Sequence, residues 1–295
     1  MSTVTKAGFI SIVGKPNAGK STLLNAVLGQ KLAITNPKAQ TTRHRIKGIH
    51  HHKDAQFVFS DTPGIINPAY KLQEEMMGAV KESINDADVL VVLIDMTSPK
   101  LHEDVITLIT QAPCKKILAI NKIDEADQEA VTKTLHEFKE LIKPDDTIIL
   151  SALRNFNIGG LLDMIYDFCP EHPAYYPEDQ LTDKSERFFV SEIIRDKLLK
   201  HYQQEIPYSV EVVVEAFKEK KTLIKISAVI YCERDSQKVI IIGKNGLGLK
   251  RVGTEARKDI EKFLDNKVFL ELFVKVREKW RNDDKQLKRF GYKND

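Results

Sequence analysis

The sequence predicts an α/β domain built on a mostly parallel sheet, followed by a smaller α+β domain. Over residues 7–168, short apolar runs alternate with helix-length amphipathic segments, a pattern typical of strands joined by helices. Three prolines then fall within 170–177 and interrupt the periodic pattern. After Pro207 the rhythm changes to alternating, strand-like segments. These segments span 209–217, 222–231 and 268–276.

These patterns also place the domain boundaries and the remaining elements. We expect a first domain over 1–169, a linker over 170–183 and a second domain over 184–295. The first domain should hold strands at 8–13, 55–60, 89–94, 117–120 and 147–150, with helices at 101–111 and 127–142. The second should hold a helix over 185–202 with Ser185 or Asp183 as N-cap, a strand at 238–242, and a helix over 247–264 interrupted around Gly253.

Length and composition are those of a globular protein. The 295 residues fit about two domains, and 42% hydrophobic with 29% charged residues are ordinary values. No window approaches about 18 consecutive apolar residues, so we expect no transmembrane helix, and the first strand starts too early for a signal peptide. Cys114, Cys169 and Cys232 lack metal-ligand spacing, which favours reduced thiols in the cytoplasm.

Charge is distributed unevenly along the chain. Residues 1–180 contain 19 basic and 23 acidic residues, a net charge of −4. Residues 181–295 contain 26 basic and 19 acidic residues, a net charge of +7. A basic second half indicates a polyanionic partner, although a solvated lysine-rich surface would give the same count.

A phosphate-binding pattern follows the predicted strand at 8–13. It reads Gly, four residues, then Gly-Lys-Ser, and comprises Gly14, Lys15, Pro16, Asn17, Ala18, Gly19, Lys20 and Ser21. Glycines let several backbone N–H groups turn toward one anion, and the following helix presents its positive end to the same anion. Lys20 would supply a full charge to the β- and γ-phosphates, and the Ser21 hydroxyl would bind Mg²⁺.

Three more motifs each follow a predicted strand. They are Asp61-Thr62-Pro63-Gly64, then Asn121-Lys122 with Asp124, then Ser151-Ala152-Leu153. Asp61 and Gly64 suit a sensor of Mg²⁺ and the γ-phosphate. Asp124 could accept hydrogen bonds from guanine N1–H and N2, a pair that adenine lacks, and a backbone N–H in the last motif could reach guanine O6. Because parallel strands end at one edge of a sheet, all four motifs should form one site.

The order of these motifs resembles that of the translation-factor-related GTPases. The resemblance implies a P-loop GTPase fold, GTP and GDP as ligands, and Mg²⁺ as cofactor. It assigns catalytic roles to Lys20, Thr42, Asp61 and Gly64, and Mg²⁺ binding to Ser21, Thr42 and Asp61. Alignment on the following Arg43 favours Thr42 over Thr41 as the residue that completes the Mg²⁺ shell in the GTP state.

Two positions bear on how hydrolysis would proceed. Ile65 and Ile66 follow Gly64, in the region where Ras-type switches have a glutamine that orients water. Neither isoleucine can orient water by a side-chain hydrogen bond. We therefore expect slow intrinsic hydrolysis. Asn17 matches the residue that binds K⁺ in some related GTPases, which makes K⁺ a candidate further cofactor with Asn17 as its ligand. The plainer interpretation is that Asn17 only shapes the loop.

A second loop, Gly243-Lys244-Asn245-Gly246, precedes the helix predicted at 247–264. Its glycines permit a tight turn that can face a sugar-phosphate backbone. The basic residues that follow would strengthen phosphate attraction, and they are Lys250, Arg251, Arg257 and Lys258. A bare Gly-x-x-Gly is a weak signal. The order of helices and strands around it, and its close resemblance to KH loops, predict an α+β type II KH domain that binds RNA through Gly243, Lys244, Asn245, Gly246, Lys250 and Arg251.

A GTPase joined to one C-terminal KH domain resembles the Era family of bacterial GTPases. The likeness extends over nearly the whole chain and includes 40–48, 207–210, 253–258 and 280–292. It implies a GTP-hydrolysing switch that binds the 3′ end of 16S rRNA and assists assembly of the small (30S) ribosomal subunit. It also implies a cytoplasmic protein with peripheral contact to the inner membrane, and nothing in the sequence requires more than a monomer.

Three other functions compete with this one. A GTPase that drives tRNA modification would carry a C-terminal cysteine, whereas the last cysteine here, Cys232, lies inside a predicted strand. An RNA-binding protein with a relic nucleotide fold is disfavoured by the intact motifs. A membrane-associated switch could use the basic segment 275–281, whose charge RNA binding explains equally well. We expect His50, His51 and His52 to form an exposed hairpin turn rather than a metal site.

Overall fold

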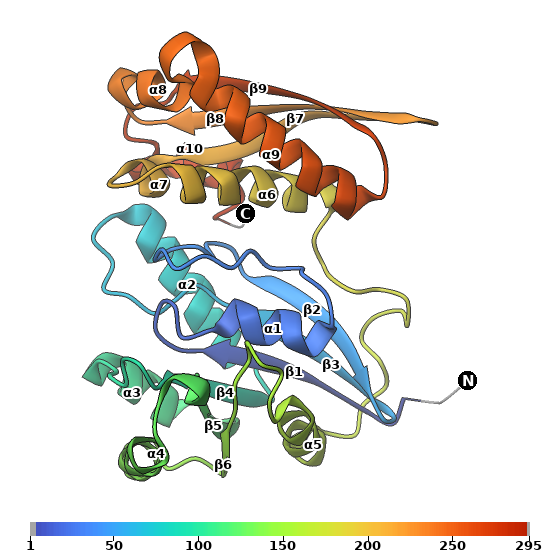
Figure 1. The fold of residues 1–295 in the computed structure, drawn as a ribbon. Helices are drawn as coiled ribbons and strands as arrows, with labels where there is room; N and C mark the ends of the chain where they lie inside the picture. Colours follow the sequence, from blue (N-terminus) through green and yellow to red (C-terminus); the bar gives the residue numbers. More distant parts are fainter. Residues whose placement is uncertain (1–3, 294–295) are drawn as a thin grey trace. The chain divides into compact units, whose positions relative to one another are not determined.

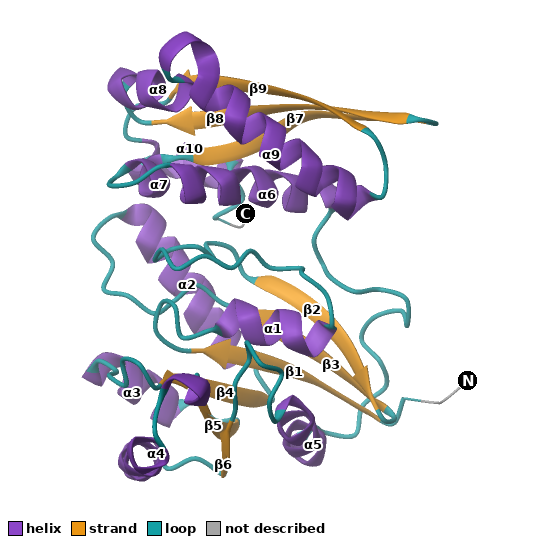
Figure 2. Ribbon diagram, viewed as in Figure 1, coloured by secondary structure: helices purple, strands orange, loops and turns teal. Residues whose placement is uncertain are grey.

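The computed structural model describes residues 4–293, which form two compact units. The first unit contains the chain up to Pro68 and Met76–Asp183, and the second contains Ala69–Glu75 and the chain from Lys184 onward. Figure 1 shows the order of their elements, and in Figure 2 each unit consists of a sheet with flanking helices. Within residues 4–293, no helix is both long and apolar enough to cross a membrane.

The first unit is built on a six-stranded sheet. Its strands lie in the order β2-β3-β1-β4-β5-β6, and every neighbouring pair is parallel except β2 with β3. The predicted mostly parallel sheet is therefore confirmed. The strands are β1 Lys6–Val13, β2 Ile46–His52, β3 Ala55–Asp61, β4 Val89–Asp95, β5 Lys115–Asn121 and β6 Asp146–Ile149.

Helices cover both faces of this sheet. They are α1 Lys20–Leu28, α2 Lys71–Asn85, α3 Glu103–Gln111, α4 Gln128–Ile142 and α5 Ile158–Phe168, with a short 3₁₀ helix η1 at Ile123–Glu125. All seven residues of β4 are buried. Because successive side chains of a strand point to opposite faces, this burial requires cover on each face. Such a strand reads as a continuous apolar run, which is why Val89 to Ile94 could be recognised in the sequence.

One prediction for this unit was wrong. His50, His51 and His52 do not form a turn but the last three residues of β2, paired antiparallel with β3. The hairpin turn lies at Lys53 and Asp54 instead, with Lys53 in a left-handed conformation. Three polar residues before a strand looked like a loop, although strand β2 at the sheet edge tolerates polar side chains.

The register of the strands brings the motifs to one edge of the sheet. Ile12 pairs with Asp61, and Asp95 pairs with Asn121, so β1, β3, β4 and β5 end at nearly the same level. Ligands of open α/β sheets bind outside the carboxyl ends of the strands. The fold therefore gathers the motifs where a ligand would bind.

The segment 170–183 is bound along the first unit rather than free. The buried side chain of Gln56 accepts hydrogen bonds from the N–H groups of Tyr175 and Tyr176, at 2.8 and 3.0 Å, and donates one to Tyr176 O. Near its end, the segment pairs with β2, where Ile49 N–H donates to Leu181 O. This segment thus continues the hydrogen bonding of the β2 edge.

The second unit folds around a three-stranded sheet in the order β7-β8-β9. Strands β7 and β8 are antiparallel, and β8 and β9 are parallel. The elements are α6 Glu186–His201, α7 Ile206–Ser209, β7 Glu211–Lys220, β8 Leu223–Cys232, α8 Asp235–Ile242, η2 Lys244–Gly246, α9 Leu247–Leu264, β9 Val268–Val276, η3 Trp280–Asn282 and α10 Asp284–Arg289. This arrangement confirms the predicted α+β type.

The core of the second unit lies between helices and one face of the sheet. Ile226 and Ile230 of β8 are buried there together with Ile194 of α6 and Ile260 of α9. Helix α6 begins as predicted, because the Ser185 side chain accepts a hydrogen bond from the N–H of Phe188 and so caps the first turn.

Two predictions for the second unit were wrong. The apolar run at 238–242 is not a strand but the end of helix α8, because a short apolar run looks alike in both structures. Helix α9 is continuous through Gly253. A Cβ at Gly253 would lie 3.3 Å from a methyl group of Leu272, so this glycine serves close packing of the helix on β9 rather than a break.

We predict that Gln56→Ala will loosen the segment 170–183. The change leaves two N–H groups and one C=O of the segment without their buried partner, at about 1–3 kcal/mol for each unsatisfied group. Amide hydrogen exchange should become faster at Tyr175 and Tyr176 while β1 stays protected. Gln111→Ala, at an exposed helix end, is the control. Unchanged exchange at both tyrosines would contradict this role of Gln56.

Candidate nucleotide site and RNA groove

The phosphate loop is preformed around a buried lysine. Gly19 has a φ of 97°, and a Cβ there would lie 2.3 Å from the Asn121 amide nitrogen, so only glycine fits. Lys20 Nζ donates to the carbonyl oxygens of Gly14 and Lys15, at 3.2 and 2.8 Å. Burial lowers the pKa of Lys20 to about 8, against the opposing effect of Asp61. A phosphate anion would favour the charged form.

Three oxygen atoms from three segments meet beside this lysine. Ser21 Oγ lies 2.9 Å from Thr42 Oγ1 and 2.7 Å from Asp61 Oδ2, and Thr42 Oγ1 lies 3.3 Å from the same carboxylate oxygen. Asp61 Oδ1 is buried and makes no hydrogen bond within residues 4–293. Burial raises the pKa of Asp61 to about 6, while the Ser21 hydrogen bond and the Lys20 charge oppose the rise. Hydroxyl and carboxylate oxygens are what Mg²⁺ prefers, so these residues fit the ion.

The geometry distinguishes between the two neighbouring threonines. Thr41 Oγ1 donates hydrogen bonds to the carbonyl oxygens of Asn36 and Lys38, at 3.2 and 2.5 Å, within its own loop. Thr42 Oγ1, in contrast, faces Ser21 and Asp61. Thr42 is thus the threonine placed to complete a metal shell.

Gly64 brings the second switch segment against the phosphate loop. A Cβ on Gly64 would lie 2.6 Å from Pro16 N and Cα, so any side chain would push the two segments apart. The backbone N–H of Ile65 donates to Gly14 O at 3.2 Å, and the Thr62 hydroxyl donates to Ile12 O at 2.8 Å. These contacts hold the segment after β3 beside the loop that would cradle phosphate.

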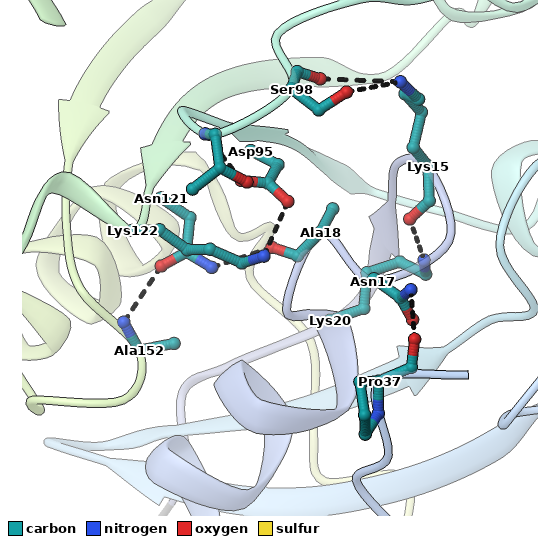
Figure 3. A network of polar contacts seen from close by, with 11 residues as sticks. Lys15, Asn17, Ala18, Lys20, Pro37, Asp95, Ser98, Asn121, Lys122 and Ala152 are labelled. Atoms are coloured by element: carbon teal, nitrogen blue, oxygen red, sulfur yellow. Dashed lines mark hydrogen bonds and ion pairs between the residues drawn. The ribbon is translucent and has the colours of Figure 1, made fainter. Parts of the chain in front are cut away.

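Asn121 ties the phosphate loop to the base-binding end of the site (Figure 3). Its Nδ2 donates to Ala18 O at 2.8 Å, and its Oδ1 accepts from Ala152 N–H at 3.0 Å. Ser151 N–H donates to Phe156 O. Since both N–H groups are used, that of Leu153 is the donor this segment can offer to guanine O6.

The other residues predicted to read the base are held by acidic and basic partners. Lys122 Nζ lies 2.6 Å from Asp95 Oδ2, which fixes the lysine along the site (Figure 3). A hydrogen bond from Ser151 lowers the pKa of Asp124, and Arg154 Nε lies 3.6 Å from Asp124 Oδ2. Asp124 is therefore ionised and able to accept two hydrogen bonds.

A cavity of about 710 Å³ opens over the phosphate loop, and it is large enough for a nucleotide, although Asp124 is not among the residues that line it. Residues from all four motifs line it, including Lys20, Gly64, Lys122 and Leu153. Asn17 lies on its wall in a left-handed conformation and donates from its amide nitrogen to Pro37 O at 2.6 Å (Figure 3). The amide oxygen of Asn17 is thus the end able to bind a cation.

The sequence did not point to Asp95, Ser98 or Arg154 as parts of this site. Asp95 orients Lys122, and the Ser98 hydroxyl accepts a hydrogen bond from Lys15 Nζ at 3.2 Å. A usable signal existed for Asp95, because it ends an apolar strand as Asp61 does. The contact of Arg154 with Asp124 depends on the shape of a loop and leaves no such signal.

The predicted RNA loop in the second unit is a tight turn. Gly243, Asn245 and Gly246 all have positive φ values, of 72°, 53° and 75°. A Cβ on Gly243 would lie 2.9 Å from Gly248 N, so the loop packs closely on the start of α9. The adjoining groove is lined by Gly246, Leu249, Lys250, Gly253, Thr254, Arg257, Leu270 and Leu272.

Of the predicted RNA contacts, Gly246 and Lys250 line this groove. Arg251 points elsewhere and lies 3.6 Å from Glu255, one turn along α9. The groove also contains Arg257, one of the four basic residues expected to strengthen phosphate attraction. The leucines of the groove offer apolar surface for bases, and its cationic side chains offer positive charge for phosphates.

Comparisons with known proteins agree with this architecture. A family model described as a 50S ribosome-binding GTPase matches residues 9–122, and a KH domain model matches 205–281. GTPase Era of Clostridium kluyveri is 44% identical over 98% of this chain and 99% of its own length. GTPase Era of Geotalea daltonii is 46% identical over 97% of each. The chain belongs to the Era family of GTPases.

Solved structures of Era are similar over the whole chain. A crystal structure of Era with MgGDPNP and nucleotides 1506–1542 of 16S ribosomal RNA has a TM-score of 0.94 and 36% identity, over 98% of this chain and 100% of that one. A variant of Aquifex aeolicus Era bound to GDP and AlF₄⁻ has a TM-score of 0.93, with the same identity and coverage. The P-loop GTPase fold followed by a KH domain is thereby confirmed.

We predict that Gly64→Ala will weaken binding of a GTP analogue by about tenfold or more and leave GDP binding within about twofold. The added methyl group would clash with Pro16 and keep the 61–64 segment away from the γ-phosphate, whereas GDP has none. Isothermal titration with both nucleotides measures the difference. Gly78→Ala, in open space on α2, is the control. Equal losses for the two nucleotides would exclude this explanation.

Proposed function

We propose that the protein is a GTP-hydrolysing switch that uses Mg²⁺ and binds RNA through its KH groove. The observation behind the proposal is the cluster of Ser21, Thr42 and Asp61 oxygens beside Lys20. Each oxygen comes from a different segment, so a metal held there would couple the segments to the nucleotide. Asp124, with its lowered pKa, supports guanine as the base.

Hydrolysis in this site would depend on charge neutralisation and on backbone groups. Lys20 would neutralise charge on the β- and γ-phosphates, and Mg²⁺ held by Ser21, Thr42 and Asp61 would supply further positive charge there. The Ile65 side chain is apolar and buried, and its N–H is already donated to Gly14 O. No side chain there replaces a water-orienting glutamine, which supports slow intrinsic turnover.

For the RNA partner we propose the 3′ end of 16S rRNA, and for the process assembly of the 30S subunit. The support is the similarity to Era solved with nucleotides 1506–1542 of that RNA, together with the cationic groove beside α9. We further propose that the protein acts in the cytoplasm as a monomer, with peripheral contact to the inner membrane. Such contact requires no membrane-spanning helix.

We expect a non-hydrolysable GTP analogue to tighten RNA binding about tenfold relative to GDP, within the usual range of allosteric coupling. The probe is a single strand with the sequence of the 16S rRNA 3′ end, measured by fluorescence anisotropy at fixed salt. Lys20→Ala, which removes the phosphate contact, should bind RNA equally with either nucleotide. If the wild-type protein also shows equal affinities, it is no switch, and if neither state binds, the RNA partner is wrong.

We also propose that Asn17 Oδ1 binds K⁺ next to the phosphates. Its amide nitrogen is committed to Pro37 O, so the oxygen is the free end, and a cation there could supply part of the charge of an arginine finger. Hydrolysis should be at least about fivefold faster in KCl than in NaCl, and Asn17→Ala should abolish that difference. Identical hydrolysis rates of the wild-type enzyme in both salts would contradict K⁺ binding, and the role of Asn17 would then be its hydrogen bond to Pro37.

A further inference from the structure

The sheet of the second unit has a face that its core does not use. Along β8, Ile224, Ile226, Ala228 and Ile230 point into the core, so Lys225 and Ser227 point to the opposite, outer face. On β9 the same alternation places Phe269 and Phe273 on that outer face. Their side chains are 48% and 49% exposed, which is unusual for two large apolar residues on one short strand.

Among the described residues, the C-terminal segment covers the outer face at the Tyr231 end. There the ring of Phe290 lies 5.3 Å from that of Tyr231, centroid to centroid, and Arg289 lies over the same tyrosine. Tyr231 is consequently 1% exposed. The C-terminal segment thus shields the Tyr231 end, whereas Phe269 and Phe273 remain exposed to water. Covering these two rings would remove apolar surface from water and so be favourable.

Lysines gather at the Phe269 end of this face, while Glu271 lies between the two rings on β9. Lys225 pairs with Phe269 across the strands, and its ammonium lies 5.8 Å from that ring's centroid. Five lysines belong to or flank this end of the sheet, namely Lys218, Lys220, Lys221, Lys225 and Lys267, against three carboxylates, Glu219, Asp265 and Glu271. Exposed rings on a flat sheet beside cations are the features by which proteins stack and hold unpaired bases.

Strand β9 connects this face to the RNA groove. Leu270 and Leu272, on one side of β9, line the groove together with Lys250 and Arg257. Phe269 and Phe273 project from the other side of the same strand, and β9 is an edge strand. A polynucleotide that lies in the groove can therefore pass over one strand edge and reach the rings.

We propose that the outer face formed by Lys225, Phe269 and Phe273 is a second RNA-binding surface, which takes unpaired nucleotides of the same strand that fills the groove. The inference rests on the proposed RNA-binding function and extends it. A groove of this kind holds about four bases, so longer RNA must continue somewhere. Stacking of bases on the two rings, with phosphates near the lysines, gives that continuation a defined path.

The test compares two RNA lengths. One probe is a strand of about six nucleotides, enough for the groove, and the other is the 3′-terminal stretch of 16S rRNA with the limits of the fragment bound in the related structure, 1506–1542. With the GTP analogue bound, Phe269→Ala/Phe273→Ala should weaken binding of the longer RNA about tenfold. Binding of the shorter RNA should change less than about twofold.

Control variants separate the two surfaces. Lys250→Ala, in the groove, should weaken both RNAs alike, and Leu141→Ala, an exposed leucine of α4, should affect neither. Lys225→Gln should reduce the slope of log affinity against log salt by about 0.7 for the longer RNA alone. Circular dichroism would verify that each variant is folded.

Three results would overturn the inference. If the double variant binds the longer RNA as the wild type does, the outer face binds no RNA, while the groove function stands. If the double variant loses both RNAs equally, the rings support the groove rather than a second surface. If it instead loses binding to phosphatidylglycerol vesicles and keeps the longer RNA, the face binds lipid. Wild-type protein that binds neither RNA would refute the proposed function itself.

Discussion

The buried carboxylate of Asp61 constrains the whole phosphate end of the site. Asp61 is fully buried, and an ionised group in that position is costly unless partners surround it. Its partners are Ser21 and Lys20, where the phosphate loop runs into α1, and Thr42, in the loop before β2. These segments must therefore close around one charge. A divalent cation would bind the buried Asp61 carboxylate, whose Oδ1 makes no hydrogen bond within residues 4–293.

The base end of the site is organised by a neutral amide instead. Asn121 donates to Ala18 O and accepts from Ala152 N–H, and both of these hydrogen bonds are made within the protein. Lys122 is likewise held by Asp95. The base end of the site is thus held by amide hydrogen bonds and an ion pair within the protein, while the phosphate end depends on charges that a ligand supplies. This division suits a protein that keeps its base and exchanges its γ-phosphate.

Much of this architecture could be predicted because its determinants are local in the sequence. Each nucleotide motif directly follows an apolar strand, and strand ends in a parallel sheet share one edge. The helix at 235–242 could not be predicted, because Val239 to Ile242 would be equally apolar in a strand. Nor could the attachment of 170–183 to Gln56, since prolines mark a break in periodicity but not the partner on which the chain then lies.

The attachment of 170–183 to the first unit also shortens the connection from that segment to helix α6. Asp183 Oδ1 accepts a hydrogen bond from Lys47 N–H, and helix α6 begins at Glu186. Only Lys184 and Ser185 lie between these two residues, and the three steps of chain from Asp183 to Glu186 can span only about 10 Å. A short connection keeps the local concentration of one unit around the other high. RNA captured by the second unit would thereby stay within reach of the nucleotide cycle of the first.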